Sequence, residues 1–89
     1  MNLSSYTIKN KLLLIKTGHV FRHYKGGYYK IIILAKHSDT LEEVVVYKAL
    51  YKNNESQIWV RPIKDFIGLV KIAKGKTVNR FQYVSAFIE

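Results

Sequence analysis

The sequence predicts a small, mainly β domain, built as a closed or half-closed barrel of five or six short strands. With 89 residues, the chain has the length of one domain with a small core. Its apolar fraction of 48% is ordinary for a folded protein and too high for a disordered chain. From residue 19 on, runs of β-branched and aromatic residues alternate with short polar or glycine-containing segments, a pattern typical of strands joined by tight turns.

The start of the chain has a different pattern. Two serines near the start can cap a helix, and Ile8, Leu12 and Ile15 follow near helical spacing. The leucine run that begins at Leu12 could equally begin a strand. We therefore expect residues 1–17 to form a short helix or an arm, ahead of a β domain over residues 18–89.

The first predicted hairpin joins residues 19–24 and 28–37 around a Lys-Gly-Gly loop. A two-residue turn at the glycines would mix cations and aliphatic side chains on both faces. A three-residue loop, which pairs Tyr24 with Tyr28 and Phe21 with Ile31, separates the two kinds of side chain. Because register decides which side chains are buried, we predict the three-residue loop. The inward set is then Phe21, Tyr29, Ile31, Ile33 and Ala35, and the outward set is Arg22, Tyr24, Tyr28 and Lys30.

The later elements are predicted from shorter patterns. Residues 37–43 read as a polar turn, and residues 43–52 as a strand that is apolar on both faces. A strand over residues 58–61 ends at Pro62, and one helical turn follows this proline. The chain then closes as a hairpin around Lys74-Gly75-Lys76. The side chains that we expect to be buried are Phe21, Ile31, Ile33, Val44, Val46 and Phe66.

Composition limits the classes of function. The formal charge of +9 attracts polyanions such as nucleic acids. Twelve of the fifteen cations are lysines, however, and this excess over arginine is also what a coding bias toward A and T produces. The absence of cysteine excludes disulfides and thiolate metal sites. The apolar run at residues 12–15 is too short for a membrane span or a signal peptide, so we expect a soluble cytoplasmic protein without a membrane partner.

No residue pattern predicts catalysis, a metal or a cofactor. His19, His23 and His37 are the potential imidazole ligands, but the last two lie at opposite ends of the predicted hairpin strands. Ser38 and Asp39 follow His37 directly, and neighbours on an extended chain point to opposite sides, which disfavours a triad. We therefore expect a non-enzymatic protein with no bound cofactor.

The candidate binding residues are aromatic rings and cations that alternation places together. Small barrels bind single-stranded nucleic acids by stacking bases on rings beside cations, and they bind peptides in aromatic-lined grooves. Aromatic residues also stabilise strand pairs by themselves, so a purely structural role stays open. The predicted patch consists of Arg22, Tyr24, Tyr28 and Lys30, extended by Tyr47, Tyr51, Trp59 and Arg61.

Four short motifs resemble one known family. The motifs R-H-Y-K-G, A-K-H-S, V-V-Y-x-A-L-Y and W-V-R-P occur in this order between Gly18 and Phe81. They resemble the proteins called domain of unknown function 1653. This resemblance implies an SH3-like barrel and no assigned activity. The sequence departs from the family at Leu41, where glycine is usual, at Asp65, where methionine is usual, and at Asn79, where proline is usual.

Together, the residues and the resemblance predict a non-catalytic binding module for a protein or peptide partner. The alternative is a binder of single-stranded RNA or DNA through the basic aromatic face. Exposed strand edges in so small a domain also allow a homodimer.

Overall fold

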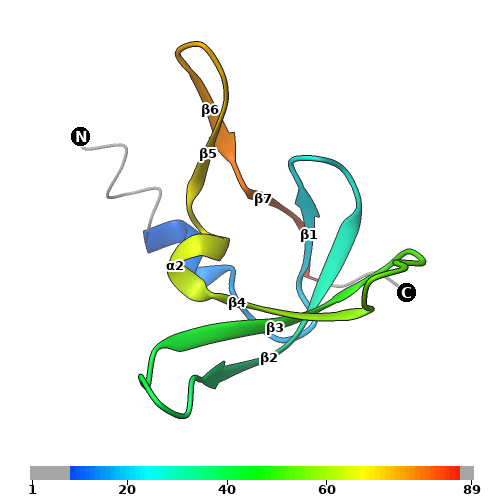
Figure 1. The fold of residues 1–89 in the computed structure, drawn as a ribbon, viewed down its shortest axis with the longest axis vertical. Helices are drawn as coiled ribbons and strands as arrows, with labels where there is room; N and C mark the ends of the chain where they lie inside the picture. The colour runs from blue at the N-terminus through cyan, green and yellow to red at the C-terminus, as the bar shows by residue number, and fades with distance from the viewer. Residues whose placement is uncertain (1–8, 87–89) are drawn as a thin grey trace.

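The computed structural model describes residues 9–86, which form two antiparallel sheets and two short helical segments (Figure 1). A helical segment over residues 9–13 comes first, and the single turn of α2 (Ile63–Phe66) lies between β4 and β5. The larger sheet has the strand order β4-β3-β2-β1-β7, and β5 pairs with β6 in a separate hairpin. The strands are β1 (Val20–His23), β2 (Tyr28–Lys36), β3 (Glu43–Ala49), β4 (Ile58–Pro62), β5 (Leu69–Ala73), β6 (Lys76–Asn79) and β7 (Phe81–Ser85).

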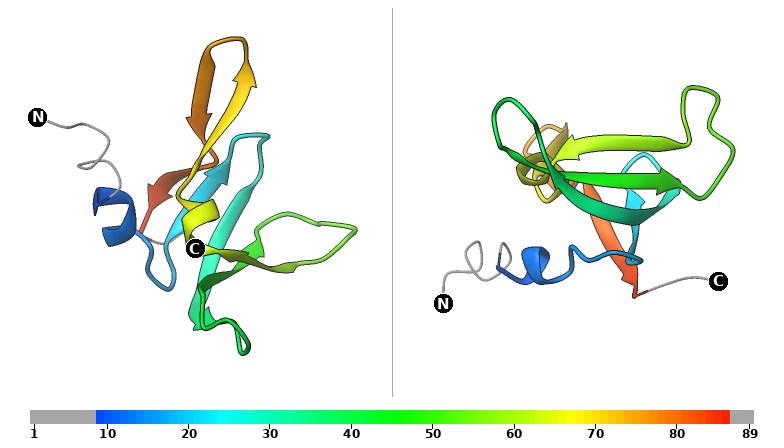
Figure 2. Two further views of the ribbon diagram at one scale, coloured as in Figure 1. Left: turned by 60° about the vertical axis from the view of Figure 1, so that its left-hand side comes forward. Right: turned by 90° about the horizontal axis from the view of Figure 1, so that it is seen from below.

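The mainly β class is confirmed, with seven strands in the described residues instead of five or six. The predicted closing hairpin is β5–β6, but the chain then continues into β7, which pairs with β1 at the far edge of the larger sheet. This sheet curls so that β3 and β4 run across the direction of β1 and β7 (Figures 1 and 2). Within residues 9–86, the two sheets do not join into one closed barrel.

The N-terminal segment packs on the β domain. Residues 9–13 are helical, while the two serines predicted to cap this helix lie outside the described residues. Ile15 is buried in the core, and Lys11 Nζ donates a hydrogen bond to the carbonyl oxygen of Ile67 (2.8 Å). No helix in the described part of the chain is long and apolar enough to cross a membrane.

The predicted register of the first hairpin is wrong by two residues. Phe21 lies opposite Tyr29, and Arg22 lies opposite Tyr28. The loop still has three residues, but it spans residues 24–26 instead of 25–27, because the chain reverses between His23 and Gly27 with both glycines at positive φ (102° and 87°). A shift of two residues keeps every side chain on its face. Phe21 and Tyr29 therefore still point inward, as predicted.

A β-bulge in β2 overturns the predicted burial of Ile33. Ile31 lies opposite Tyr47, but Ile33 lies opposite Val46, so Ile32 is an extra residue in β2. Beyond the bulge, the alternation of faces is reversed. Ile31 is 1% exposed, whereas Ile33 is 54% exposed, and Val46 is half-buried instead of buried.

The core lies inside the curl of the larger sheet. Of the predicted core residues, Phe21, Ile31, Val44 and Phe66 are buried, as expected. The ring of Phe66 stacks on that of Phe81, with centroids 4.0 Å apart and planes 7° apart. The buried cluster consists of Ile15, Phe21, Ile31, Val45, Tyr47, Phe66 and Phe81.

The turn between β2 and β3 contains a non-glycine residue with left-handed backbone geometry. Leu41 has a φ of 63°, and its N–H donates to the carbonyl oxygen of His37 (2.8 Å). L-residues other than Gly, Asn and Asp rarely adopt this conformation because Cβ crowds the neighbouring carbonyl. The turn is therefore strained at Leu41.

Candidate functional site

The main candidate site is an open hollow of about 270 Å³ on the inner face of the larger sheet. We call it the aromatic cleft. Its walls come from β1, β2, β3, β4, β7 and the loop between β3 and β4. The lining residues are His23, Tyr29, Tyr47, Asn53, Glu55, Trp59, Arg61 and Phe81.

Strand pairing brings the rings together. Tyr47 on β3 lies opposite Trp59 on β4, and partners across antiparallel strands share a face. The Tyr47 ring is 5.4 Å from the Tyr29 ring and 5.4 Å from the Phe81 ring, in edge-to-face contacts. Only 5% of Tyr47 is exposed, so it forms the floor of the cleft.

Two side chains of the cleft are held by hydrogen bonds. The Trp59 indole Nε1 donates to the carbonyl oxygen of Ser56 (2.9 Å), which fixes the ring against the β3–β4 loop. Arg61 Nε donates to the hydroxyl of Tyr47 (3.4 Å). The remaining guanidinium N–H groups of Arg61 can bind an acceptor on a ligand.

Tyr51 fastens the β3–β4 loop to the first hairpin. Its hydroxyl makes a short hydrogen bond with the hydroxyl of Tyr29 and accepts one from Asn53 Nδ2 (3.2 Å). A Cβ added to Gly27 would lie 2.7 Å from Cε1 of Tyr51, so only glycine leaves room for this ring. Burial and the Tyr51 hydrogen bond raise the pKa of Tyr29, which keeps this hydroxyl protonated at ordinary pH.

The cleft holds a neutral imidazole with positive charges near it. Burial lowers the pKa of His23, and the nearby charges of Arg61, Arg80 and Lys25 lower it further. At pH 7, His23 is therefore an uncharged hydrogen-bonding group. In the lining itself, Arg61 is balanced by Glu55. Arg80 and Lys25 add positive charge near His23, so the field on that side of the cleft favours an anionic ligand.

The eight residues predicted as one patch are divided between the two faces of the sheet. Tyr47, Trp59 and Arg61 lie in the aromatic cleft, and Tyr51 lies beside it through its bond with Tyr29. The remaining four are Arg22, Tyr24, Tyr28 and Lys30, which do not line the cleft.

The outward set lies where the sequence predicts it for Arg22, Tyr28 and Lys30, but Tyr24, which was expected to be exposed, does not. Arg22 is opposite Tyr28, and Lys30 is opposite Lys48, so these side chains share the outer face of the sheet. Tyr28 is 45% exposed, as expected. Tyr24 is half-buried, and its ring lies 4.7 Å from the His23 ring.

Sequence reasoning missed five lining residues of the cleft. The alternation of β1 and β2 did place His23 and Tyr29 inward, but we interpreted the inward set as core. Phe81 comes from the last strand, and Asn53 and Glu55 come from a polar loop, so no periodic pattern marked them. Within residues 9–86, no group of three or more His, Cys, Asp and Glu residues is placed to hold a metal ion.

The comparisons agree with the motifs. No curated protein is similar to this chain. The chain is similar to a protein from Bordetella bronchiseptica whose crystal structure is described as belonging to DUF1653. The two are 32% identical, with a TM-score of 0.70 over 83% of this chain and 91% of the other. The sequence profile described as "Protein of unknown function (DUF1653)" matches residues 19–83. The chain therefore belongs to the DUF1653 family.

Proposed function

We propose that this protein is a non-catalytic binding module that holds a short acidic peptide segment of a partner protein in the aromatic cleft. The observation that carries the proposal is the convergence of four rings and Arg61 around one hollow. Ligand sites are mostly apolar, with a few polar groups that fix orientation. A hollow of about 270 Å³ suits one or two side chains of an extended segment.

The polar groups of the cleft support binding without catalysis. Trp59 and Arg61 are held by bonds to the protein itself, and the Tyr29 hydroxyl is engaged by Tyr51. His23 Nδ1 accepts a hydrogen bond from the backbone N–H of Lys25 (3.2 Å). These bonds preform the walls of the cleft, and a preformed site lowers the entropic penalty of binding.

Trp59 provides the readout for the test. It is the single tryptophan of the chain and lines the cleft. We would titrate three synthetic peptides of equal length, in which the same positions carry Glu, Gln or Lys. The Glu peptide should change Trp59 fluorescence and bind at least tenfold more tightly than the Lys peptide. Equal affinities, or unchanged fluorescence with all three, would contradict the proposal.

A matched pair of variants locates the site. Arg61→Gln should weaken the Glu peptide about five- to tenfold, because it removes a charge-assisted hydrogen bond at the cleft. Lys71→Gln removes the same charge from the exposed face of β5 and should change affinity less than twofold. If both variants weaken binding equally, the peptide is held by net charge and not by the cleft.

Nucleic-acid binding is the second candidate. It is supported by the cross-strand pairs Arg22–Tyr28 and Lys30–Lys48, which place an exposed ring among three cations on the outer face. A uridine oligonucleotide should then bind more weakly as salt rises. Tyr28→Ala should weaken it severalfold while Arg61→Gln has little effect. An oligonucleotide that responds to neither substitution would remove this candidate.

We also propose that the fold is an SH3-like barrel, as the resemblance implies. Two backbone hydrogen bonds support this assignment because they tie the two sheets together. Tyr24 N–H donates to Arg80 O (3.0 Å), and Arg80 N–H donates to Gly68 O (3.0 Å). In solution, cross-strand contacts between the β5–β6 hairpin and β4 or β7 should appear in nuclear Overhauser spectra. Their absence would leave the domain as an open curled sheet.

A further inference from the structure

The second half of β2 has an unpaired edge. β2 pairs with β3 as far as Lys36, but it pairs with β1 no further than Lys30. Ile31 still exchanges backbone hydrogen bonds with Gly18 and His19, after which no described strand follows on that side. We call residues 28–31 of β2 the closed half and residues 33–36 the open half.

The alternation of hydrogen bonds identifies the free backbone groups. His37 N–H donates to Glu42 O, so the backbone hydrogen-bonding groups of residue 37 point toward β3. In an antiparallel ladder, successive residues face opposite sides. The backbone N–H and C=O groups of Ile33 and Ala35 therefore also point toward β3. Those of Leu34 and Lys36 point toward the open edge.

We propose that this edge pairs with the open half of β2 in a second copy of the chain, which joins the two larger sheets across a two-fold axis at Ala35. Leu34 would then exchange hydrogen bonds with Lys36 of the partner subunit, and Lys36 with Leu34 of the partner subunit. An isologous interface requires this reciprocity. The residue on the axis meets its own copy, and alanine is small enough for close approach there.

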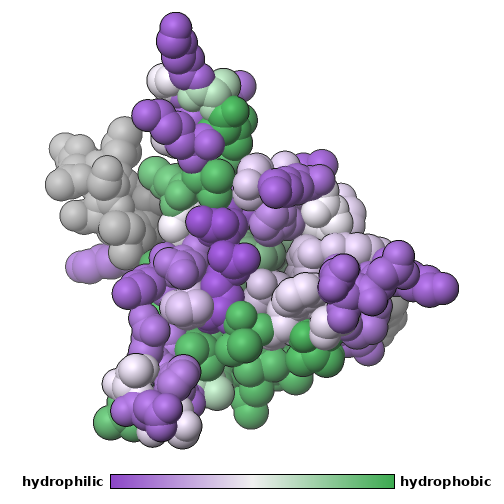
Figure 3. Space-filling model, in the orientation of Figure 1, coloured by the Kyte–Doolittle hydropathy of each residue, from purple (hydrophilic) through white to green (hydrophobic). Residues whose placement is uncertain are grey.

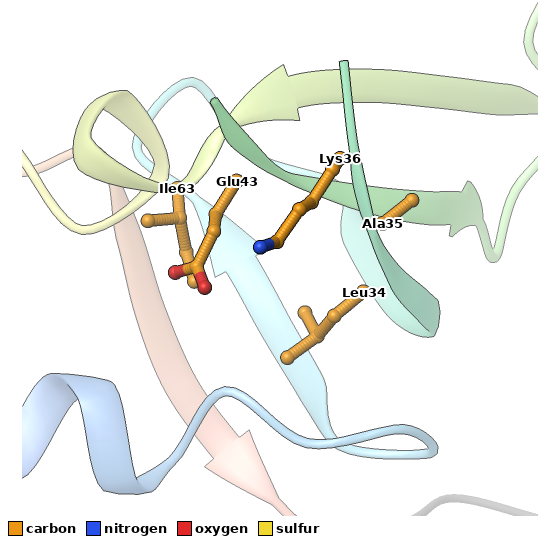
Figure 4. Close-up of a pocket in the computed structure, with 5 residues that line it drawn as sticks. All are labelled: Leu34, Ala35, Lys36, Glu43 and Ile63. Atoms are coloured by element: carbon orange, nitrogen blue, oxygen red, sulfur yellow. The ribbon is translucent and has the colours of Figure 1, made fainter. Parts of the chain in front are cut away.

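The side chains at the edge fit a second copy. A hollow of about 200 Å³ lies beside the open half and is lined by Leu34, Ala35, Lys36, Glu43 and Ile63. Figure 4 shows that Leu34, Lys36 and Glu43 extend into this space, while Ala35 points away. Residues paired across the axis share a face. Leu34 and Lys36 of the partner subunit would therefore enter the same space.

Charge at the edge favours a second copy over an acidic segment. Four of the six acidic residues of the chain lie in or near the turn after β2 and in α2: Asp39, Glu42, Glu43 and Asp65. The net positive charge of the chain, which repels a second copy, is thus absent near the open half of β2. Glu42 and Glu43 disfavour an acidic segment, while each copy brings both Lys36 and Glu43, so opposite charges meet in the pair.

The open half also exposes apolar surface that pairing would cover. Leu34 in the open half is 44% exposed, and Ile32, at the bulge just before it, is 38% exposed. Hydrophobic side chains gather over the part of Figure 3 where Figure 1 shows β2, β3 and β4. Exposed apolar strand edges are templates for pairing with another chain.

Hydrogen exchange tests the edge directly, because alternate amides should behave differently. The amides of Leu34 and Lys36 should exchange at least tenfold more slowly at millimolar than at low micromolar protein concentration. The amides of Ile33 and Ala35 should be protected at both, since they face β3. Sedimentation should show the mass rising from 10.4 kDa toward twice that value over the same range. Fast exchange at Leu34 and Lys36 at millimolar concentration would overturn the proposal.

Two glutamate substitutions test whether self-association uses this edge or the outer face of the sheet. Ala35→Glu places like charges opposite each other on the axis and should weaken self-association at least tenfold. Val60→Glu adds the same charge to β4, where Val60 is 63% exposed. This variant should change the strength of self-association less than twofold. Protection of the Ile31 amide shows that each variant is folded. Loss of self-association in Val60→Glu but not in Ala35→Glu would assign the interface to the outer face and overturn the proposal.

Discussion

The closed and open halves of β2 differ in burial although each contains an isoleucine of the same apolar run. Ile31 and Ile33 are two residues apart in the run Ile-Ile-Ile, yet the first is fully buried and the second is more than half exposed. The closed half has β1 on one side and β3 on the other, while the open half has only β3. Residue type therefore does not decide burial in this strand. The bulge at Ile32 and the start of β1 decide it.

The largest expected effect contrasts these two isoleucines. Ile31→Ala should lower the free energy of unfolding by about 2–5 kcal/mol, because it leaves a cavity in the packed core. Ile33→Ala should lower it by about 0.5 kcal/mol or less, as is usual for exposed positions. Urea denaturation at low micromolar concentration measures both. Equal losses would mean that the bulge is absent and that Ile33 also points inward.

The next effect concerns the turn that leads into the closed half. Gly27→Ala should destabilise the fold by about 2–4 kcal/mol, because it combines positive-φ strain with a clash against the Tyr51 ring. Gly26→Ala is the matched control: it carries the same kind of strain, but no atom lies within 4 Å of its added Cβ. The difference between the two should shrink in a Tyr51→Ala background. A difference that persists there would place the clash elsewhere.

A smaller effect, of opposite sign, is expected in the turn that follows the open half. Leu41→Gly should raise the free energy of unfolding by about 0.5–1 kcal/mol, because glycine adopts a φ of 63° without the Cβ penalty. Part of this gain is offset by the larger backbone entropy of glycine in the unfolded chain. Leu41→Ala keeps the Cβ and should change stability little. Thermal denaturation of the three proteins would show whether the turn is strained.

The smallest effect is a pH dependence at His23, the last residue of β1, which is the strand that pairs with the closed half. The pKa of His23 is lowered in the folded protein, so below pH 6.5 the unfolded chain binds more protons than the folded one. The contribution of His23 is thus fully present above the unfolded pKa and is lost as pH falls through the folded pKa. Urea midpoints between pH 7.5 and 5 should fall less steeply in His23→Gln. An unchanged slope would show that His23 remains solvated.

Strand positions were predictable because they depend on local patterns. The glycine pair predicted the first hairpin, Pro62 predicted the end of β4, and Phe66 was correctly placed in the core. The bulge was not predictable, because an unbroken apolar run has no alternation that could reveal an extra residue. The hairpin register also failed, since the sequence does not show at which residues the chain reverses when two adjacent glycines can both adopt positive φ.

The candidate site was predictable only in part. Trp59 and Arg61 lie on one face of β4, as alternation predicts, and both line the cleft. Tyr47 and Tyr51 were grouped by the same rule, but β3 ends at Ala49, so Tyr51 belongs to a loop with its own geometry. Phe81 reaches the cleft through the pairing of β7 with β1, about sixty residues apart in the chain. Contacts of this kind follow from the whole topology.

The pairing of β1 with β7 has a consequence for synthesis in the cell. β1 lies between β2 and β7, so the edge of β1 that pairs with β7 stays unpaired until β7, which ends at Ser85, has left the ribosome. Phe81 is likewise needed to complete the aromatic core around Phe21 and Phe66. Chains are made at about 5–20 residues per second, and non-local strand pairing is slow. A nascent chain that lacks β7 therefore exposes its core, and the domain can complete its folding only once β7 has emerged.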